Sequence, residues 1–110
     1  MNKYYDEKSK SLTLVTGFEG EELETETYQY PFFVKGIYTK KAIDLGAELE
    51  ENKFIVGADL FDRITSFIVE LYNKQFNHET LTNGIDARVI VETYIAILMG
   101  VLQGETSKKE

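Results

Sequence analysis

The sequence contains no cysteine and a single histidine, His78. The absence of cysteine excludes disulfide bonds, thiol catalysis and cysteine-ligated metal sites. One histidine cannot build a multi-histidine metal site, and without cysteine it has no thiol partner for nucleophilic catalysis. We therefore expect that the protein is not an enzyme and has no catalytic, cofactor-binding or metal-binding residues.

Positive charge is also scarce, because 12 Lys and Arg residues stand against 19 Asp and Glu residues, which gives a formal net charge of −7. Nucleic-acid binding depends on clustered basic side chains that displace counterions, and the sequence has no such cluster. No apolar run reaches the roughly 18 residues that span a bilayer, and the N-terminal MNKYYDEKSK lacks the apolar centre of a signal peptide. These features predict a cytoplasmic protein that binds neither nucleic acid nor membrane.

The chain does have enough apolar material for one core. Its 110 residues include 7 Phe and 7 Tyr, and 43% of them are hydrophobic. A chain of this size can fold as one domain without disulfide bonds or structural metal ions. Residues 11–104 are therefore predicted to form a single α+β domain, preceded by a flexible N-terminus at residues 1–10 and followed by a polar tail at residues 105–110.

Two alternating, β-branched runs predict a β-hairpin over residues 11–30. The first run covers residues 12–16 and the second covers residues 23–30. Gly17 and Gly20 lie between them, and both are expected to supply the positive φ angles of the turn.

The remaining residues show the apolar period of helices, so the fold is predicted to be mainly α. The hairpin should be followed by a small bundle of three main helices and one short helix. We expect these helices at about residues 37–51, 59–75, 78–83 and 86–103. Their end signals are three N-caps and one left-handed glycine that stops the short helix: Asp59, Asn77, Asp86 and Gly84.

Two polar features could suggest a metal site or a catalytic residue, but neither has the neighbours that such a site needs. Five glutamates lie within eight residues of the hairpin, at positions 19, 21, 22, 24 and 26. They lack the Asp and Asn series of a Ca²⁺ loop, so a solvated turn that discourages strand aggregation is favoured over a metal site. His78 has no apparent nucleophile or second histidine nearby in the sequence, so it is expected to be a surface residue.

Two apolar groups exceed the needs of a small core. The aromatic residues between positions 28 and 33 either join the core or remain exposed as an interaction patch. The terminal helix is apolar on nearly every side, so it either is fully surrounded or packs on the helices at 37–51 and 59–75 and leaves one side for a partner or a second copy. The candidate partner-binding residues are Phe32, Phe33, Tyr94, Ile97 and Val101.

Several segments resemble one protein family by their order and spacing. They are YPFFVKG at residues 30–36 with KAIDL at 41–45, the apolar helix at 61–72, QF at 75–76 with LTNGIDAR at 81–88, and GVL at 100–102. Together they resemble the tail assembly chaperones of long-tailed phages that infect Gram-positive bacteria. The resemblance covers residues 30–104, and the 29 residues before it contribute little.

The resemblance implies a small factor of the host cytoplasm that is absent from the mature virion. Such a chaperone binds the tape measure protein, keeps its apolar helices soluble and assists recruitment of tail tube subunits, without catalysis. The tail tube protein is thus a second expected partner, and self-association into a homo-oligomer is a third option. The resemblance also raises the hypothesis of a longer, frameshifted form if an A-rich run encodes Lys108 and Lys109.

The alternative from another functional class is a small acidic inhibitor that uses the glutamate-rich hairpin as a nucleic-acid-mimicking decoy. The two hypotheses differ in the expected gene neighbourhood. A tail assembly chaperone should be encoded between the tail tube gene and the long tape measure gene, whereas a decoy should be encoded among early regulatory genes.

Overall fold

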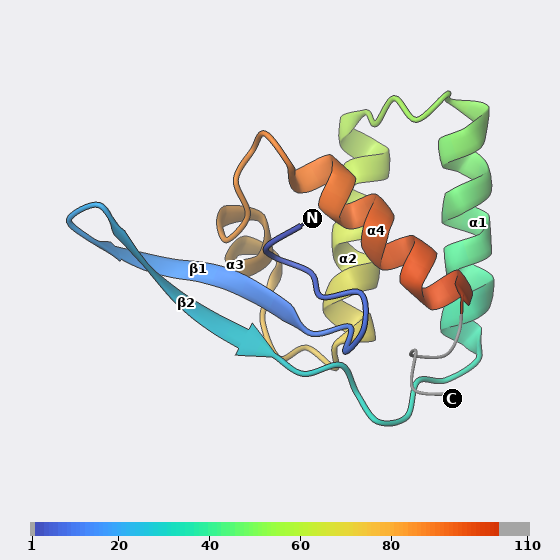
Figure 1. The fold of residues 1–110 in the computed structure, drawn as a ribbon. Helices are drawn as coiled ribbons and strands as arrows, with labels where there is room; N and C mark the ends of the chain where they lie inside the picture. The colour runs from blue at the N-terminus through green and yellow to red at the C-terminus, as the bar shows by residue number, and fades with distance from the viewer. Residues whose placement is uncertain (1, 104–110) are drawn as a thin grey trace.

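A computed structural model describes residues 2–103, in which a β-hairpin precedes four helices (Figure 1). The strands β1 (Leu12–Glu19) and β2 (Glu22–Tyr28) pair antiparallel. The helices are α1 (Ile37–Glu51), α2 (Ala58–Leu71), α3 (His78–Asn83) and α4 (Ile90–Gln103). The fold is α+β and mainly α, which confirms the predicted class.

Only one of the two hairpin glycines serves the turn. Gly20 begins the two-residue turn with a φ of 64°. Gly17 instead lies within β1, next to an irregularity in the register between Val15 and Gly17. A β-carbon there would approach Glu24 Oε1 at 2.7 Å, but this oxygen ends an exposed, flexible side chain that can move away, so space alone does not require glycine. The prediction that Gly17 supplies a positive φ was wrong.

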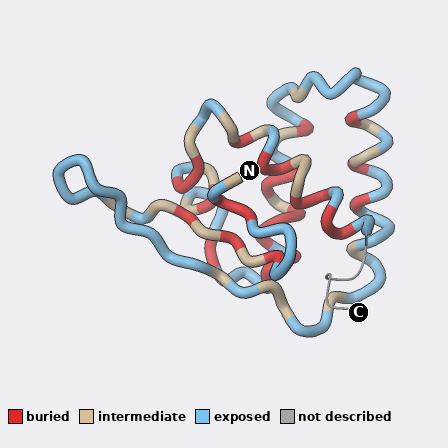
Figure 2. Tube along the Cα trace, viewed as in Figure 1, coloured by how far each residue is buried: buried red, intermediate tan, exposed pale blue. Residues whose placement is uncertain are grey.

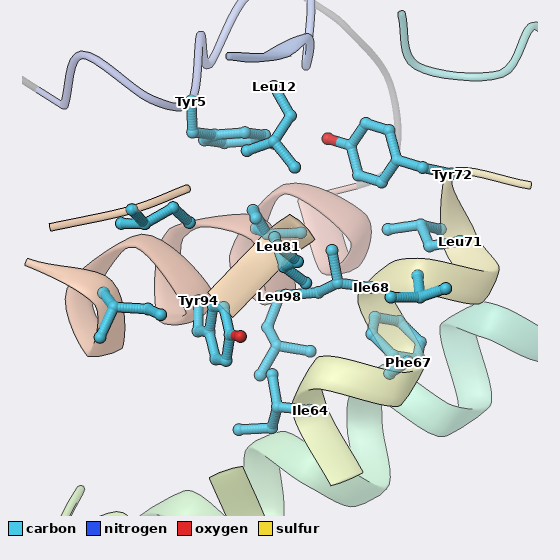
Figure 3. Close-up of a cluster of buried hydrophobic side chains, with 14 of the residues drawn as sticks. Tyr5, Leu12, Ile64, Phe67, Ile68, Leu71, Tyr72, Leu81, Tyr94 and Leu98 are labelled. Carbon is cyan, nitrogen blue, oxygen red and sulfur yellow. The ribbon is translucent and has the colours of Figure 1, made fainter. Parts of the chain in front are cut away.

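The core is built around α4. Figure 2 shows buried residues along this helix, along the inner face of α2 and at the base of β1. In Figure 3, Ile64 and Ile68 of α2 face Leu98 of α4, with Leu12 of β1 closing the cluster from above. The central position of α4 explains why so few of its side chains are polar.

The N-terminal segment is part of this core, which corrects the prediction of a flexible terminus over residues 1–10. Tyr4 and Tyr5 are buried, and Tyr5 forms an isolated bridge with Leu12 of β1. Lys10 is buried as well, and its Nζ donates to the carbonyl oxygen of Gly100 at 2.8 Å. The segment therefore lies across α4 as a strap, and Figure 1 shows it in front of the helices.

The boundaries of α2 differ from the prediction at both ends. The helix begins at Ala58, and Gly57 is its N-cap without a side-chain bond. Asp59 is thus not the N-cap, because it lies inside the first turn and accepts a hydrogen bond from Arg63 Nε at 2.9 Å. The helix ends at Leu71 and not near residue 75, because Asn73 and Lys74 both adopt positive φ angles.

Helix α1 also ends at non-glycine residues with positive φ angles. Lys53 N donates to Glu50 O at 3.0 Å and Phe54 N donates to Leu49 O at 2.7 Å. These are the two bonds of a Schellman motif, in which a left-handed residue usually filled by glycine satisfies the last carbonyls. Here that residue is Lys53, with a φ of 55°.

The short helix α3 confirms one predicted cap and contradicts another. Asn77 Oδ1 accepts the N–H of Thr80 at 2.7 Å, as expected of an N-cap. Gly84 follows the helix but is not left-handed, since its φ is −92°. A β-carbon there would lie 2.7 Å from Thr80 O and 2.8 Å from Leu14 Cβ, so Gly84 is required for the close approach of α3 to β1.

The terminal helix begins later than predicted. Asp86 does not cap α4, which starts at Ile90, but it accepts the N–H of Arg88 at 2.8 Å and so closes the turn before the helix. Thr93 N donates to Val89 O at 2.9 Å, which adds one helical bond from the residue before α4. The predicted polar tail at 105–110 and Lys108 and Lys109 lie outside the described residues.

Candidate partner-binding surface

Three of the five candidate partner-binding residues lie in the core. Tyr94, Ile97 and Val101 are buried, and Ile97 has an exposed fraction of 0%. They pack inside the helices, so the expectation that they form an accessible face of α4 was wrong. Two neighbours cover α4. From the N-terminal strap, Asn2 Nδ2 donates to Thr93 Oγ1 at 2.7 Å, and on the side of α2 the Tyr94 ring stacks on Phe61 with centroids 5.1 Å apart.

A narrower line of α4 does remain accessible. Val91, Ile95, Met99 and Leu102 lie at the spacing of one helical stripe, and each is partly or largely exposed. The side of α4 that was predicted to stay open thus exists, but it consists of other residues than Tyr94, Ile97 and Val101.

The other two candidates are the most exposed aromatic pair of the described residues. Phe32 and Phe33 lie in the linker between β2 and α1, with exposed fractions of 104% and 69%. A side chain at full exposure touches no other part of the protein. Neighbouring large apolar side chains that are exposed together often mark an interaction surface, whereas single scattered ones are common on any protein.

The linker is held firmly on both sides of this pair. The Tyr30 ring packs edge-on against Tyr72 with centroids 5.6 Å apart, and burial raises the pKa of the Tyr30 hydroxyl, which keeps it neutral. Gln75 Nε2 donates to Gln29 O at 2.9 Å, and Val34 is partly buried against the core. Anchors before and after Phe32 and Phe33 therefore hold the backbone of the linker against the core, while the two rings extend into solvent.

A hollow adjoins the exposed pair. It measures about 480 Å³, and its lining includes Pro31, Phe32, Val34 and Thr39 together with Val101 of α4. Its position connects the linker with the C-terminal part of α4. The hollow and the two rings form one surface, which we call the aromatic linker site, and no sequence pattern had indicated the contribution of Thr39.

A second exposed apolar group lies at the loop between α1 and α2. Phe54 and Ile55 point into solvent there, and Phe54 adopts a φ of 63°. The sequence analysis did not single out this group, which lies between the predicted helices at 37–51 and 59–75. A bulky residue in the left-handed region is uncommon and holds the side chain in an unusual direction.

The structure also adds one pair that the sequence did not suggest. Ser66 Oγ lies 2.8 Å from His78 Nε2, so His78 has a hydroxyl partner after all. Among residues 2–103, no side chain is hydrogen-bonded to the other ring nitrogen, which a nucleophile–base pair requires for orientation. The bond joins α2 to α3, and we assign it a structural role.

The described residues offer no metal cluster and no membrane-spanning helix. No group of three or more His, Asp or Glu side chains in the described part of the chain is arranged to hold a metal ion, the hairpin glutamates included. Within residues 2–103, every helix is too short or too polar to cross a bilayer.

No curated protein and no solved structure matches the chain. A family model described as phage tail chaperone protein matches residues 7–110, which is nearly the whole chain. The chain therefore belongs to the phage tail chaperone family.

Proposed function

We propose that this chaperone binds the tape measure protein through the aromatic linker site, keeps that long protein soluble and assists recruitment of tail tube subunits around it. No chemical step is involved. The protein acts in the host cytoplasm during assembly and is not part of the mature virion. Membership of the family supports a role in tail assembly over the decoy alternative.

The observation that carries the proposal is the exposure of Phe32 and Phe33 on an anchored linker. Burying a phenylalanine side chain is worth about 2 kcal/mol, so two rings that enter a partner's apolar surface supply useful affinity without any loop rearrangement. An amphipathic helix is the form in which a long helical partner offers such a surface, and the hollow beside Phe32 has room for its side chains.

Coexpression with the tape measure protein encoded by the neighbouring gene tests the proposal. The wild-type chain should raise the soluble fraction of the tape measure protein. A Phe32→Ser, Phe33→Ser double variant should lose most of this effect. A Phe54→Ser, Ile55→Ser double variant is the matched control, because both residues are also exposed but lie in the loop between α1 and α2.

The two parts of the proposal fail separately in this experiment. Failure of the wild-type chain to solubilise the tape measure protein under several conditions overturns the function. Success of the wild-type chain and of the double variant alike leaves the function standing and overturns the aromatic linker site.

A further inference from the structure

The hairpin projects as a two-stranded ribbon beyond the helices (Figure 1). Its base is fixed by the buried side chains of Leu12 and Leu14, while its outer half is exposed on both faces. A ribbon of two strands has two edges, and each edge must satisfy its outward backbone groups by some partner or by water. The two edges of this ribbon differ.

The edge of β1 is closed by the protein itself. Thr13 N donates to Tyr4 O at 2.7 Å, and Val15 N donates to Gly84 O at 2.9 Å. These N–H groups therefore point away from β2. The N-terminal strap and the turn after α3 together cover this edge.

The edge of β2 is open. Thr13 faces Thr27 and Val15 faces Thr25 in the register. Since both β1 residues direct their N–H groups away from β2, these are the pairs of an antiparallel ladder that exchange no hydrogen bonds, and the backbone groups of Thr25 and Thr27 point outward too. Within residues 2–103, no backbone hydrogen bond from another element reaches β2.

The charge of the ribbon selects what can pair with this edge. Residues 11–34 contain five glutamates and no Lys or Arg. Glu22, Glu24 and Glu26 alternate along β2, are exposed, and form no ion pair with any described residue. A second copy of this strand would bring like charges together across the edge, which is unfavourable, whereas a strand with basic residues at alternate positions would neutralise them.

The opposite face of the ribbon is apolar near its tip. Phe18 and Leu23 lie across from each other in the register, and their exposed fractions are 73% and 45%. A third strand beside β2 would place one set of alternating side chains next to the glutamates and the other set next to Leu23. The best match is thus a strand that alternates basic and apolar residues.

We propose that the open edge of β2 binds an extended segment of a partner protein, with alternating basic and apolar residues, as a third strand of the ribbon. Thr25 and Thr27 supply the backbone hydrogen bonds, and the three glutamates of β2 select the basic residues. The site is separate from the aromatic linker site and does not depend on the proposed function.

The first test uses a nine-residue peptide of alternating lysine and valine as the probe and measures amide chemical shifts and affinity with the whole chain. We expect the largest shifts at Thr25 and Thr27, and a Kd that rises with salt. A Glu22→Gln, Glu24→Gln, Glu26→Gln variant should bind the peptide about tenfold more weakly than the wild-type chain does. The control replaces Glu50, Glu51 and Glu79 by Gln, which changes the net charge equally elsewhere. Equal loss in both variants means unspecific attraction and overturns the proposal.

The second test separates strand pairing from charge. Two versions of the peptide carry a methyl group on backbone amide nitrogens, one version at every lysine and the other at every valine. The side chains and the net charge of the peptide are unchanged. Only one set of amides can face β2, so one version should lose binding and the other should keep it. If both versions bind like the unmodified peptide, the proposal is wrong. Shifts at Thr25 and Thr27 that depend on protein concentration without peptide would identify a second copy as the occupant, which also overturns it.

Discussion

The hydroxyl group of Tyr5 lies where a β-carbon on Gly100 would have to be. This contact joins the N-terminal strap to the C-terminal part of α4. The hydrogen bond from Lys10 Nζ to Gly100 O connects the same two segments. A glycine inside a helix costs stability relative to alanine, so its presence there needs a reason. The reason is the space that the Tyr5 ring takes.

The first prediction concerns this space. Gly100→Ala should lower the free energy of unfolding by about 1–3 kcal/mol, because the added methyl group overpacks against a buried ring. Gly46→Ala is the matched control inside α1, where the new β-carbon meets only Leu102 Cδ1 at 3.8 Å. That control should raise stability by about 1 kcal/mol. Urea denaturation measures both.

A double variant isolates the cause. Tyr5→Phe removes the hydroxyl oxygen from the space in question, so Gly100→Ala should cost less in the Tyr5→Phe background than in the wild type. Additive effects of the two substitutions would show that Tyr5 and Gly100 are not in contact.

The second prediction concerns the end of α1. Lys53→Gly should stabilise the protein by about 1 kcal/mol, because glycine adopts the left-handed conformation of this position without steric cost. Asn73→Gly, at the equivalent position after α2, should gain less because asparagine tolerates this conformation better than lysine does. Midpoints of urea unfolding at unchanged m-value provide the comparison. A loss of stability in Lys53→Gly would contradict the positive φ of Lys53.

The third prediction separates core from surface among the candidate residues. Ile97→Asp should unfold the isolated protein, because it buries a carboxylate without a partner in the centre of the fold. Phe32→Asp should leave the helical circular dichroism signal and the cooperative melt unchanged, because the Phe32 side chain touches nothing. A folded Ile97→Asp protein would place α4 differently from the structure described above.

The fourth prediction concerns alkaline pH. Burial raises the pKa of Tyr94 to about 12, and burial also raises the pKa values of the Tyr5 and Tyr72 hydroxyls above the ordinary value near 10. Below pH 10 these groups are protonated whether the chain is folded or unfolded, so their contribution to stability is complete. Above pH 10 the unfolded chain loses these protons first, so stability falls as pH rises towards the pKa values of the folded state.

Melting temperatures between pH 8 and pH 12 measure this loss. They should stay level up to about pH 10 and then fall, with about 1.4 kcal/mol lost per pH unit for each tyrosine that ionises only on unfolding. Tyr94→Phe should make the decline less steep. A melting temperature that stays level beyond pH 11 would mean that these hydroxyls are not buried.

Much of the fold follows from local patterns in the sequence. The apolar stripe from Leu60 to Leu71 predicts α2 and its buried face, and Asn77 predicts the start of α3, because both depend only on neighbours within a few residues. Gly20 is found in the same way. These features were predictable because no distant contact overrides them.

The misplaced ends of α2 and the late start of α4 are local errors of a few residues, whereas the larger errors arise from distant contacts. The strap around Tyr5 looked loose because its partners on α4 lie about 90 positions further along the chain, as the Lys10–Gly100 bond with its separation of 90 residues illustrates. Gly84 looked like a helix stop, but the approach of β1 determines it. The burial of the α4 candidates has the same kind of cause, because Tyr94 bonds to Thr65 and stacks on Phe61 of α2, about 30 positions earlier in the chain.

The strap has a consequence for synthesis on the ribosome. Residues 2–10 leave the exit tunnel long before residues 90–103, which form the helix that they bind. Until residues 90–103 emerge, the apolar faces of α2 and β1 have no central helix to cover them, so the nascent chain cannot complete its core one element at a time. The core can therefore close only after α4 has been made, and a translational pause before α4 would expose an incomplete core to aggregation.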